Sequence, residues 1–462
     1  MQALRHDARR LNAGDRLPSV RALMARYRVS PVTVRQAMAR LAREGLLDAR
    51  PGQGTFLMAA APAPPAASDF AWQGVALGPA RIAADDVTAL LTAAPRGAVN
   101  LAGGYPPEDL QAVDLVSRAL ARAARRPGVW DRMPLEGIEG LRSWVAAQLG
   151  AGVTAREVVI CPGSQSAIAT AFHALAEPGA PVLIESPSYV GAIVAARAAG
   201  LRLVPVPTDA HGVVPELLAQ AFETSGARIC YVQPLHANPS GATLAVERRA
   251  QVLDVLRARR ALLIEDDWCR DLSFERTPPR PLFADDVHGH CVYLRSLTKS
   301  SAPGLRVGAI AARGAALARL AASRVVTEFF VAGPIQEAAL EVVHAPAWQR
   351  HLRRVRATLM TRRDRLVMAV RRHFGEHSLT VVPTGGMHSW LRLPDDVDAE
   401  ALAVRAAEAG VIVSGGRRWF PAEPTGSFLR LSYASADDQL ERAIETLATL
   451  AGRRAPARRS RR

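Results

Sequence analysis

The sequence contains almost no lysine. Of its 58 basic side chains only Lys299 is a lysine, and all the others are arginines. A coding bias toward arginine would explain this depletion, but it would not explain why one lysine remains. Arginine stays protonated in proteins and cannot condense with an aldehyde, whereas a lysine in suitable surroundings can lose its proton and react. We therefore interpret Lys299 as a position that needs a primary amine.

The sequence also lacks cysteine patterns for metal binding and long apolar runs. No CxxC or Cys/His spacing occurs among the four cysteines, Cys161, Cys230, Cys269 and Cys291. This predicts reduced thiols in a cytoplasmic protein and no metal site. No apolar run reaches the roughly eighteen residues of a transmembrane helix, and the charged N-terminus does not resemble a secretion signal. We therefore expect no association with a membrane.

Positive charge is concentrated at the two ends of the chain. Residues 1–58 hold eleven arginines and four acidic residues, and the tail 453–462 holds six arginines and no acidic residue. These segments carry thirteen of the fifteen net positive charges. A basic end on a nearly neutral body predicts a polyanionic partner. For the tail alone, a solvated end without a partner is the alternative.

The pattern of apolar residues divides the chain into several domains. Residues 59–68 are rich in alanine and proline and predict a linker, which we extend over 59–98. Residues 99–345 alternate apolar runs with amphipathic segments, which predicts βα repeats and a mainly parallel sheet. Residues 346–452 combine a long arginine-rich helix with short strands, which predicts a smaller α+β domain. The expected strands of the sheet are 158–160, 181–184, 201–206, 228–232, 261–264, 291–294 and 307–311.

Residues 1–58 have the pattern of two short helices and a hairpin. Ser19 is a suitable N-cap, and one helical face follows it: Val20, Leu23, Met24 and Tyr27. Ser30 and Pro31 begin a second helix, and residues 51–54, PGQG, predict a hairpin turn. This order is typical of a winged helix-turn-helix, whose second helix enters the major groove of DNA. Other small helical domains show the same spacing.

The segment GDRLPSVRALMARYRVSPVTVRQAMARLAREGLLDARPGQGTFL, residues 14–57, closely resembles the DNA-binding domain of the GntR regulator family. The resemblance implies contacts with phosphates or base edges by two groups of residues, one on the helices and one at the wing tip. These residues are Arg21, Ser30, Thr33, Arg35, Gly52 and Gln53. The helix expected before Gly14 is short, so either it is trimmed or the start codon is misassigned.

Lys299 lies in a longer motif, SLTKSSAPGLRVG (residues 296–308), that follows an apolar strand. Parallel α/β sheets place their ligands at the carboxyl ends of strands. Ser296 and Arg306 add a hydroxyl and a fixed cation suited to a phosphate. The motif resembles the Schiff-base segment of fold type I enzymes that depend on pyridoxal 5′-phosphate (PLP), the aspartate aminotransferase superfamily. The resemblance implies that Lys299 binds PLP covalently.

Five further motifs occur in the chain order of that superfamily, although each alone has an ordinary structural explanation. The resemblance implies that Gly163, Ser164 and Gln165 hold the PLP phosphate at a helix N-terminus. It also implies that Tyr189 covers the pyridine ring and that Asn238 donates to the phenolic oxygen. Two roles remain, and both concern charged groups. Asp266 would pair with the pyridine nitrogen, and Arg430 would bind a substrate α-carboxylate.

The whole chain resembles the MocR subfamily of GntR regulators, which implies PLP binding and a head-to-tail homodimer. Two departures concern the tuning of the cofactor. The family usually has a tyrosine two or three residues after the aspartate, where this chain has Trp268 and Cys269. It also usually has a tyrosine upstream of Gly137, for which Trp130 or Arg132 would have to substitute. We therefore expect PLP binding to persist and transamination to be slow or absent.

Three functional hypotheses follow from these patterns. The first is a regulator that senses PLP, an amino acid or another amine and alters its affinity for DNA in response. The second is an aminotransferase with an appended DNA-binding domain. The third is a DNA-binding protein whose large domain serves only for dimerisation, which predicts that no cofactor binds.

Overall fold

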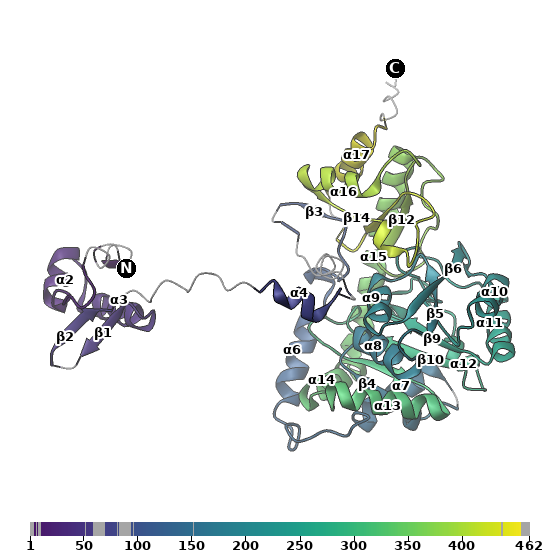
Figure 1. Ribbon diagram of the computed structural model, residues 1–462, viewed down its shortest axis with the longest axis horizontal. Helices are drawn as coiled ribbons and strands as arrows, with labels where there is room; N and C mark the ends of the chain where they lie inside the picture. Colours follow the sequence, from purple (N-terminus) through teal and green to yellow (C-terminus); the bar gives the residue numbers. More distant parts are fainter. Residues whose placement is uncertain are drawn as a thin grey trace. The chain divides into compact units, whose positions relative to one another are not determined.

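The computed structural model describes residues 4–5, 7, 11–50, 52–58, 70–80, 82, 94–95, 97–150, 152–435 and 438–453. The chain forms two compact units, Met1–Ala80 and Arg81–Arg462 (Figure 1). Most of the predicted linker, of the basic tail and of the helix expected before Gly14 lies outside the described residues. The domain boundaries therefore stay predictions. Within the described part, no helix is long and apolar enough to cross a membrane, and no cluster of side chains is suited to a metal ion.

The N-terminal unit has the two helices and the hairpin that the sequence predicts. Its elements are α2 (Val20–Tyr27), α3 (Pro31–Arg43), β1 (Leu47–Arg50) and β2 (Gly54–Leu57), and the two strands pair antiparallel. The hydroxyl of Ser19 accepts from the backbone N–H of Ala22, and that of Ser30 from the N–H of Thr33. Each side chain thus satisfies a donor that the helix leaves free at its first turn.

A small apolar core holds this unit together. Leu23 of α2, Val34 and Leu41 of α3 and Leu47 of β1 are buried against one another. Their helical spacing leaves the polar residues of α3 on the outside. A further short helix, α4 (Trp72–Leu77), lies within the segment predicted as linker and has no buried residue.

The large unit is built on an eight-stranded mixed sheet in the order β4-β11-β10-β9-β8-β5-β6-β7. Figure 1 labels β4, β5, β6, β9 and β10 of this sheet. The central strands from β10 to β6 are parallel, as the sequence predicts, whereas β11 is antiparallel to both of its neighbours. The prediction did not anticipate that reversal, because a short buried strand has the same composition in either direction. The strands are β4 (Val158–Cys161), β5 (Pro181–Ser186), β6 (Arg202–Asp209), β7 (Gly212–Val213), β8 (Ile229–Val232), β9 (Leu262–Asp267), β10 (Cys291–Ser296) and β11 (Gly308–Ala311).

Helices cover both faces of this sheet. Successive side chains of a strand point to opposite faces, so Leu183 of β5 joins one core and its neighbours Val182 and Ile184 join the other. One core contains residues of α6 (Val113–Ala123), α7 (Glu139–Leu149), α10 (Pro215–Ser225), α11 (Val246–Arg259), α12 (Leu282–Asp285) and α14 (Gly333–His344). The other contains residues of α8 (Ser164–Leu175), α9 (Val190–Ala198) and α13 (Gly314–Glu328).

A smaller α+β part follows, as predicted, and begins with the long helix α15 (Pro346–Phe374). Its three-stranded antiparallel sheet has the order β12-β15-β14. The short strand β3 (Val99–Asn100) pairs with β13 (Val411–Ile412), so the chain at residue 99 packs against this C-terminal part. Its other elements are β12 (His388–Arg392), α16 (Ala399–Glu408), β14 (Ser414–Gly415), β15 (Phe428–Ser432) and α17 (Leu440–Leu450).

Candidate functional site

A pocket in the large unit brings together residues that are far apart in the sequence. It lies where strands of the large sheet end, as expected for a parallel α/β sheet, and two residues of the smaller part, His388 and Arg430, help to line it. Its empty volume is about 1020 Å³, including the space at its open mouth. It contains nine of the ten residues predicted to bind or serve the cofactor and its substrate: Ser164, Gln165, Tyr189, Asn238, Asp266, Ser296, Lys299, Arg306 and Arg430.

Lys299 lines the pocket next to Gly104 and Tyr105, which line it as well. Its Nζ donates to the carbonyl oxygen of Gly104 at 2.6 Å and lies 3.5 Å from the centre of the Tyr105 ring. Burial, together with the nearby Arg430 and Arg306, lowers the pKa of Lys299 to about 7. A substantial fraction of this amine is therefore neutral near neutral pH, which is the form that attacks an aldehyde.

Asp266 is the last residue but one of β9 and lines the pocket, with only 1% of its surface exposed. Its Oδ2 accepts from the hydroxyl of Tyr231 at 2.5 Å and from Nε2 of Gln233 at 2.7 Å. Its Oδ1 is buried and has no hydrogen-bond partner in the described part of the chain. Burial raises the pKa of Asp266 to about 6, while the two hydrogen bonds act in the opposite direction. An orphaned carboxylate oxygen at this place fits a protonated ring nitrogen of a ligand.

The start of α8 and Arg306 form the polar end of the pocket. Gly163 is the N-cap of α8 with a φ of 96°, and a Cβ atom there would lie 2.5 Å from Nη2 of Arg306. Glycine thus leaves room for the guanidinium beside the N-terminus of the helix, where the first N–H groups have no partners within the helix. Together with the hydroxyl of Ser296, these groups form a cradle suited to a phosphate. Gly163 does not line the pocket itself but shapes this cradle.

Tyr189 and Asn238 line the body of the pocket. The hydroxyl of Tyr189 donates to Oε1 of Gln165 at 3.0 Å, which fixes the position of its ring. The backbone N–H of Asn238 donates to Oε1 of Gln233 at 2.8 Å. The side-chain Oδ1 of Asn238 is buried and has no partner among the residues described. The geometry is compatible with the roles that the resemblance implies for both residues, and those roles stay predictions.

Arg430 comes from β15 and carries a buried charge. Its guanidinium donates to the carbonyl oxygen of Ala102, lies 3.4 Å from Nε2 of His388 and packs over the Trp419 ring. No described carboxylate lies within ion-pair distance of it. Burial lowers the pKa of Arg430 to about 9. A buried cation without an anionic partner is costly, so this end of the pocket is suited to a ligand carboxylate.

The pocket therefore has an excess of positive charge. Lys299, Arg306 and Arg430 line it, and Asp266 is the one acidic residue among the described residues of its lining. Among the described residues, none of the three cations forms an ion pair. PLP has three groups that these residues suit. Its phosphate would be bound by Arg306, its pyridine nitrogen by Asp266 and its aldehyde by the amine of Lys299. The residues present thus fit PLP and leave Arg430 for a second anionic group.

Sequence reasoning missed several residues of this site. Gln233 and Tyr231 hold Asp266, and Thr298 and His388 line the pocket. His388 is 2% exposed, and burial beside Arg430 and Lys299 holds its pKa well below the usual range. A lone histidine, glutamine or threonine outside a motif gives no signal in a single sequence. Only Thr298, next to Lys299, could have been found from the motif.

The two departures from the family pattern can be located in the structure. Trp268 lines the pocket and stacks on His388 with ring centres 5.5 Å apart, but its N–H donates to the carbonyl oxygen of His236 at 3.0 Å. Cys269 is buried and does not line the pocket. Trp268 therefore does not replace the hydroxyl of a tyrosine. Trp130 and Arg132 are exposed and lie outside the lining of this pocket.

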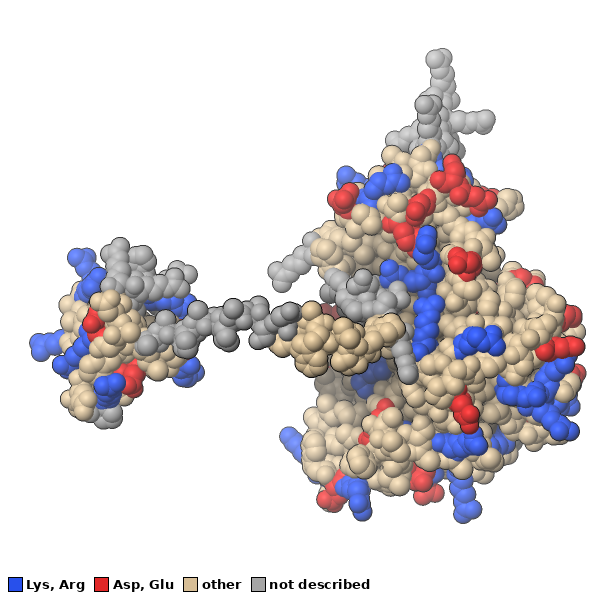
Figure 2. Space-filling view, viewed as in Figure 1, with Lys and Arg blue, Asp and Glu red and all other residues tan. Residues whose placement is uncertain are grey.

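The residues predicted to contact DNA all lie on the surface of the N-terminal unit. Arg21, Arg35, Gly52 and Gln53 are exposed, and so are Ser30 and Thr33 at the start of α3. Arg26, Arg40 and Arg50 form ion pairs, whereas Arg21 and Arg35 have no carboxylate partner among the described residues. Figure 2 shows arginines around the visible face of this unit with few acidic side chains, while both signs are interspersed on the large unit. The unpaired arginines remain available for phosphates.

Comparisons with known proteins agree with both parts. Residues 97–447 match the aminotransferase class I and II family, and residues 2–57 match the bacterial regulatory proteins of the gntR family. The chain is 26% identical to the HTH-type transcriptional regulator YdfD of Bacillus subtilis, over 94% of this chain and 91% of the relative. It is 29% identical to the vitamin B6 salvage pathway transcriptional repressor PtsJ of Salmonella typhimurium, over 95% and 93%.

A solved structure supports the fold of the large unit. The α-aminoadipate aminotransferase LysN of Thermus thermophilus, crystallised with N-(5′-phosphopyridoxyl)-L-leucine, superposes with a TM-score of 0.75 at 30% identity. The match covers 82% of this chain and 96% of LysN. The large unit thus has the fold type I architecture, whose cofactor is PLP. The chain belongs to the aminotransferase class I and II family and, with its GntR-type N-terminal domain, to the transcription regulators of the MocR type.

Proposed function

We propose that this protein binds DNA through its N-terminal unit and senses PLP, or an amino compound that reacts with it, through the Lys299 pocket. The observation that carries the proposal is the charge of this pocket, where three cations without ion-pair partners among the described residues line the same space as one buried carboxylate. Buried charges need counterparts, and a phosphate and a carboxylate would supply them. The described residues therefore suit PLP together with an amino acid.

Each residue of the pocket has a distinct part in this proposal. Lys299 provides the neutral amine, because its pKa is lowered to about 7. The first turn of α8, Ser296 and Arg306 hold the phosphate, and Asp266 holds a proton on the ring nitrogen. Bound PLP would supply an aldehyde for amines and a ring that withdraws electrons.

The effector that we propose is an amino acid, since Arg430 is placed for a carboxylate. A guanidinium binds a carboxylate through two parallel hydrogen bonds. The Nε of Arg430 is buried and has no hydrogen-bond partner among the described residues. Simple amines without a carboxylate would leave Arg430 unpaired and should therefore bind more weakly.

The DNA-binding part of the proposal rests on the exposed arginines and the wing. Arg21 and Arg35 would bind phosphates or guanines, Ser30 and Thr33 the phosphate backbone, and Gly52 and Gln53 the minor groove. We further propose a head-to-tail homodimer located in the cytoplasm. A dimer would present two N-terminal units to a symmetric or repeated DNA site.

The regulatory proposal can be tested with the full-length protein. Duplexes selected from a random pool by the purified chain would provide a DNA probe. PLP, alone or with individual amino acids, should change the affinity for this probe roughly five- to 150-fold, the usual range of allosteric coupling. The Lys299→Ala variant should bind the probe and show no such change. An affinity of the wild-type protein that PLP and every standard amino acid leave unchanged would contradict the sensing role.

The second candidate function is an aminotransferase. It is favoured by the complete set of Lys299, Asp266 and Arg430, and by 31% identity to the 2-aminoadipate transaminase of Thermus thermophilus over 78% of this chain. The loss of a tyrosine hydroxyl at Trp268 and Cys269 counts against rapid turnover. Robust steady-state transfer of amino groups to 2-oxoglutarate, without selection of any DNA sequence, would favour the enzyme over the regulator.

A further inference from the structure

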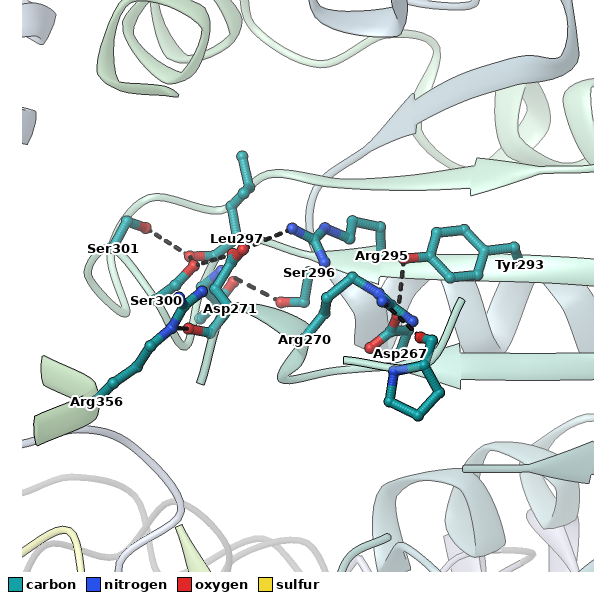
Figure 3. Close-up of polar contacts among 12 residues, drawn as sticks. Asp267, Arg270, Asp271, Tyr293, Arg295, Ser296, Leu297, Ser300, Ser301 and Arg356 are labelled. Atoms are coloured by element: carbon teal, nitrogen blue, oxygen red, sulfur yellow. Dashed lines mark hydrogen bonds and ion pairs between the residues drawn. The ribbon is translucent and has the colours of Figure 1, made fainter. Parts of the chain in front are cut away.

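A buried polar cluster lies beside the pocket, on the segment that follows Asp266. At its centre is Asp271, in the short 3-10 helix Arg270–Leu272 just after β9. Figure 3 shows its carboxylate between Arg295 and Ser300, with Arg356 extending toward it from α15. None of the roles assigned above involves this cluster. We call these four residues, Asp271, Arg295, Ser300 and Arg356, the Asp271 brace.

Both carboxylate oxygens of Asp271 are used within the brace. Its Oδ1 accepts from Nη2 of Arg295 at 2.8 Å, and its Oδ2 accepts from the hydroxyl of Ser300 at 2.8 Å. Its backbone carbonyl accepts from Nε of Arg356 at 2.6 Å. Asp271 thus connects three separate segments, which are β10, the loop that carries Lys299, and α15.

Arg295 keeps Asp271 in place. It is 2% exposed, and its Nε and Nη1 have no hydrogen-bond partner, so among the described residues Asp271 provides its ion pair. A buried guanidinium that loses its carboxylate is strongly destabilised. The carboxylate therefore cannot easily turn away from Arg295, and this gives Ser300 a fixed acceptor.

Ser300 directly follows Lys299 in the chain. Its hydroxyl is held by Asp271, and its carbonyl oxygen lies 2.9 Å from Nε2 of His351 on α15. The loop that carries Lys299 is thus bonded to Asp271 through the hydroxyl of Ser300 and to α15 through the carbonyl oxygen of Ser300. Because Asp271 does not touch Lys299, it acts on the lysine through the position of this loop.

The brace also connects Lys299 to the part of the protein that carries Arg430. Helix α15 packs through Trp348 and Leu352 into the core of the large sheet, and through Leu359 and Leu366 into the core of the smaller part. The latter core includes Leu429 and Leu431, which flank Arg430 on β15. Lys299 and Arg430, proposed to bind the two ends of an amino acid, are therefore joined through Asp271 and α15.

We infer that Asp271 is a positioning residue that sets the place of Lys299 relative to Arg430 through Ser300 and Arg356. The inference rests on the proposed role of Lys299 in binding PLP. In this view the Asp271 brace holds the ε-amino group of Lys299 at the distance from Arg430 that an α-amino acid requires. Such placement matters because reactivity and affinity both depend on small differences in the geometry of a site.

Replacing Asp271 itself would leave Arg295 buried without a partner and endanger folding. Ser300→Ala is a milder test, since it removes the bond from the loop to Asp271 and keeps the pair between Asp271 and Arg295. Ser301→Ala is a matched control. Ser301 is buried like Ser300 and belongs to the same loop. Its hydroxyl donates to the carbonyl oxygen of Leu297 at 2.6 Å, which the hydroxyl of Ser300 also contacts at 3.3 Å, so the bond to Asp271 is what distinguishes Ser300 from Ser301.

The three full-length proteins, loaded with PLP, would be compared by the rate of PLP release after dilution and by the pH midpoint of the visible absorbance. Ser300→Ala should release PLP roughly tenfold faster than wild type and shift the midpoint, since it loses a hydrogen bond to a charged group. Ser301→Ala should match wild type in both measurements. The midpoint reports the surroundings of the linked nitrogen, which a general loss of stability would not move.

Two results would overturn the inference, and they are distinguishable. If wild-type protein forms a borohydride-stable adduct at Lys299, but Ser300→Ala and Ser301→Ala release PLP equally fast with the same midpoint, Asp271 has no positioning role. If wild-type protein forms no adduct at Lys299, the proposed function fails as well.

Discussion

The two units of this protein place their arginines in opposite surroundings. Arg21 and Arg35 of the N-terminal unit are exposed, whereas Arg430 of the large unit is 4% exposed. All three lack a carboxylate partner among the described residues. An exposed arginine binds phosphate largely by releasing counterions, so its contribution falls as salt is added. A buried arginine gains from an anion that is shielded from solvent, and salt screens that interaction much less.

This difference explains how one chain can serve two anionic partners. DNA binding at the exposed surface should be strong only at modest ionic strength, whereas PLP and an amino acid should remain bound over a wide range of salt. The two sites also differ in the structure that is needed to form them. The surface of α3 needs only correct spacing on a helix, but the pocket needs the ends of several strands to meet.

The largest effect that we expect concerns Lys299. Lys299→Arg keeps the positive charge but cannot condense with an aldehyde, so it should lose the covalent link to PLP completely, as Lys299→Ala should. The visible absorbance of the purified variants would measure this. DNA binding in the absence of PLP should be unchanged, because the N-terminal unit folds around its own core. An absorbance band retained in either variant would contradict the role of Lys299.

The next largest effect concerns the buried Arg430 and the affinity for an amino acid. Arg430→Gln should weaken binding of the amino acid effector roughly thirtyfold or more, because a charged partner in a desolvated site is lost. Titration of the PLP-loaded protein with amino acids would measure it. PLP should remain linked to Lys299, and amines without a carboxylate should bind as they do to wild type. An equal loss for amino acids and simple amines would show that Arg430 does not bind a carboxylate.

A smaller effect is expected for the exposed Arg35 of the N-terminal unit, on the affinity for DNA. Arg35→Ala should weaken DNA binding about tenfold and, if Arg35 contacts a phosphate, lower the slope against the logarithm of salt by about one. Arg40→Ala is the control on the same helix, since Arg40 pairs with Glu44 and should matter little. Fluorescence anisotropy of a labelled duplex at several salt concentrations would separate the two variants. Equal behaviour would argue against the proposed interface.

The smallest effect concerns Ser30, where two substitutions distinguish a role in stability from a role in DNA binding. Its hydroxyl caps α3 by accepting from the N–H of Thr33 at 3.2 Å. Ser30→Ala should therefore lower the free energy of unfolding of the N-terminal unit by about 1 kcal/mol. Ser30→Asp preserves the cap and places a negative charge near the phosphates, so it should retain stability and lose DNA affinity. Thermal unfolding and DNA titration of both variants would test this, and unaltered DNA affinity in Ser30→Asp would remove Ser30 from the interface.

The sequence contained most of the site but little of what supports it. Lys299 and Asp266 stand in motifs near the ends of apolar strands, and Arg430 stands in a motif within one, so their chemistry and order could be predicted together. His388, Gln233 and Asp271 belong to no recognisable motif, and their contacts with or beside the site depend on the packing of strands and helices that are distant in sequence. The reversed strand β11 and the pairing of β3 with β13 were missed for the same reason, since short strands carry no signal of their partners.

The most direct test of the account uses the scarcity of lysine in this chain. The protein has two kinds of primary amine, the N-terminal amino group and the ε-amino group of Lys299. Reduction of the PLP-treated protein with borohydride, followed by peptide mass spectrometry, would locate any adduct. We predict one phosphopyridoxyl group per chain, on the peptide that contains Lys299. An unmodified Lys299 peptide after saturation with PLP would contradict the central claim.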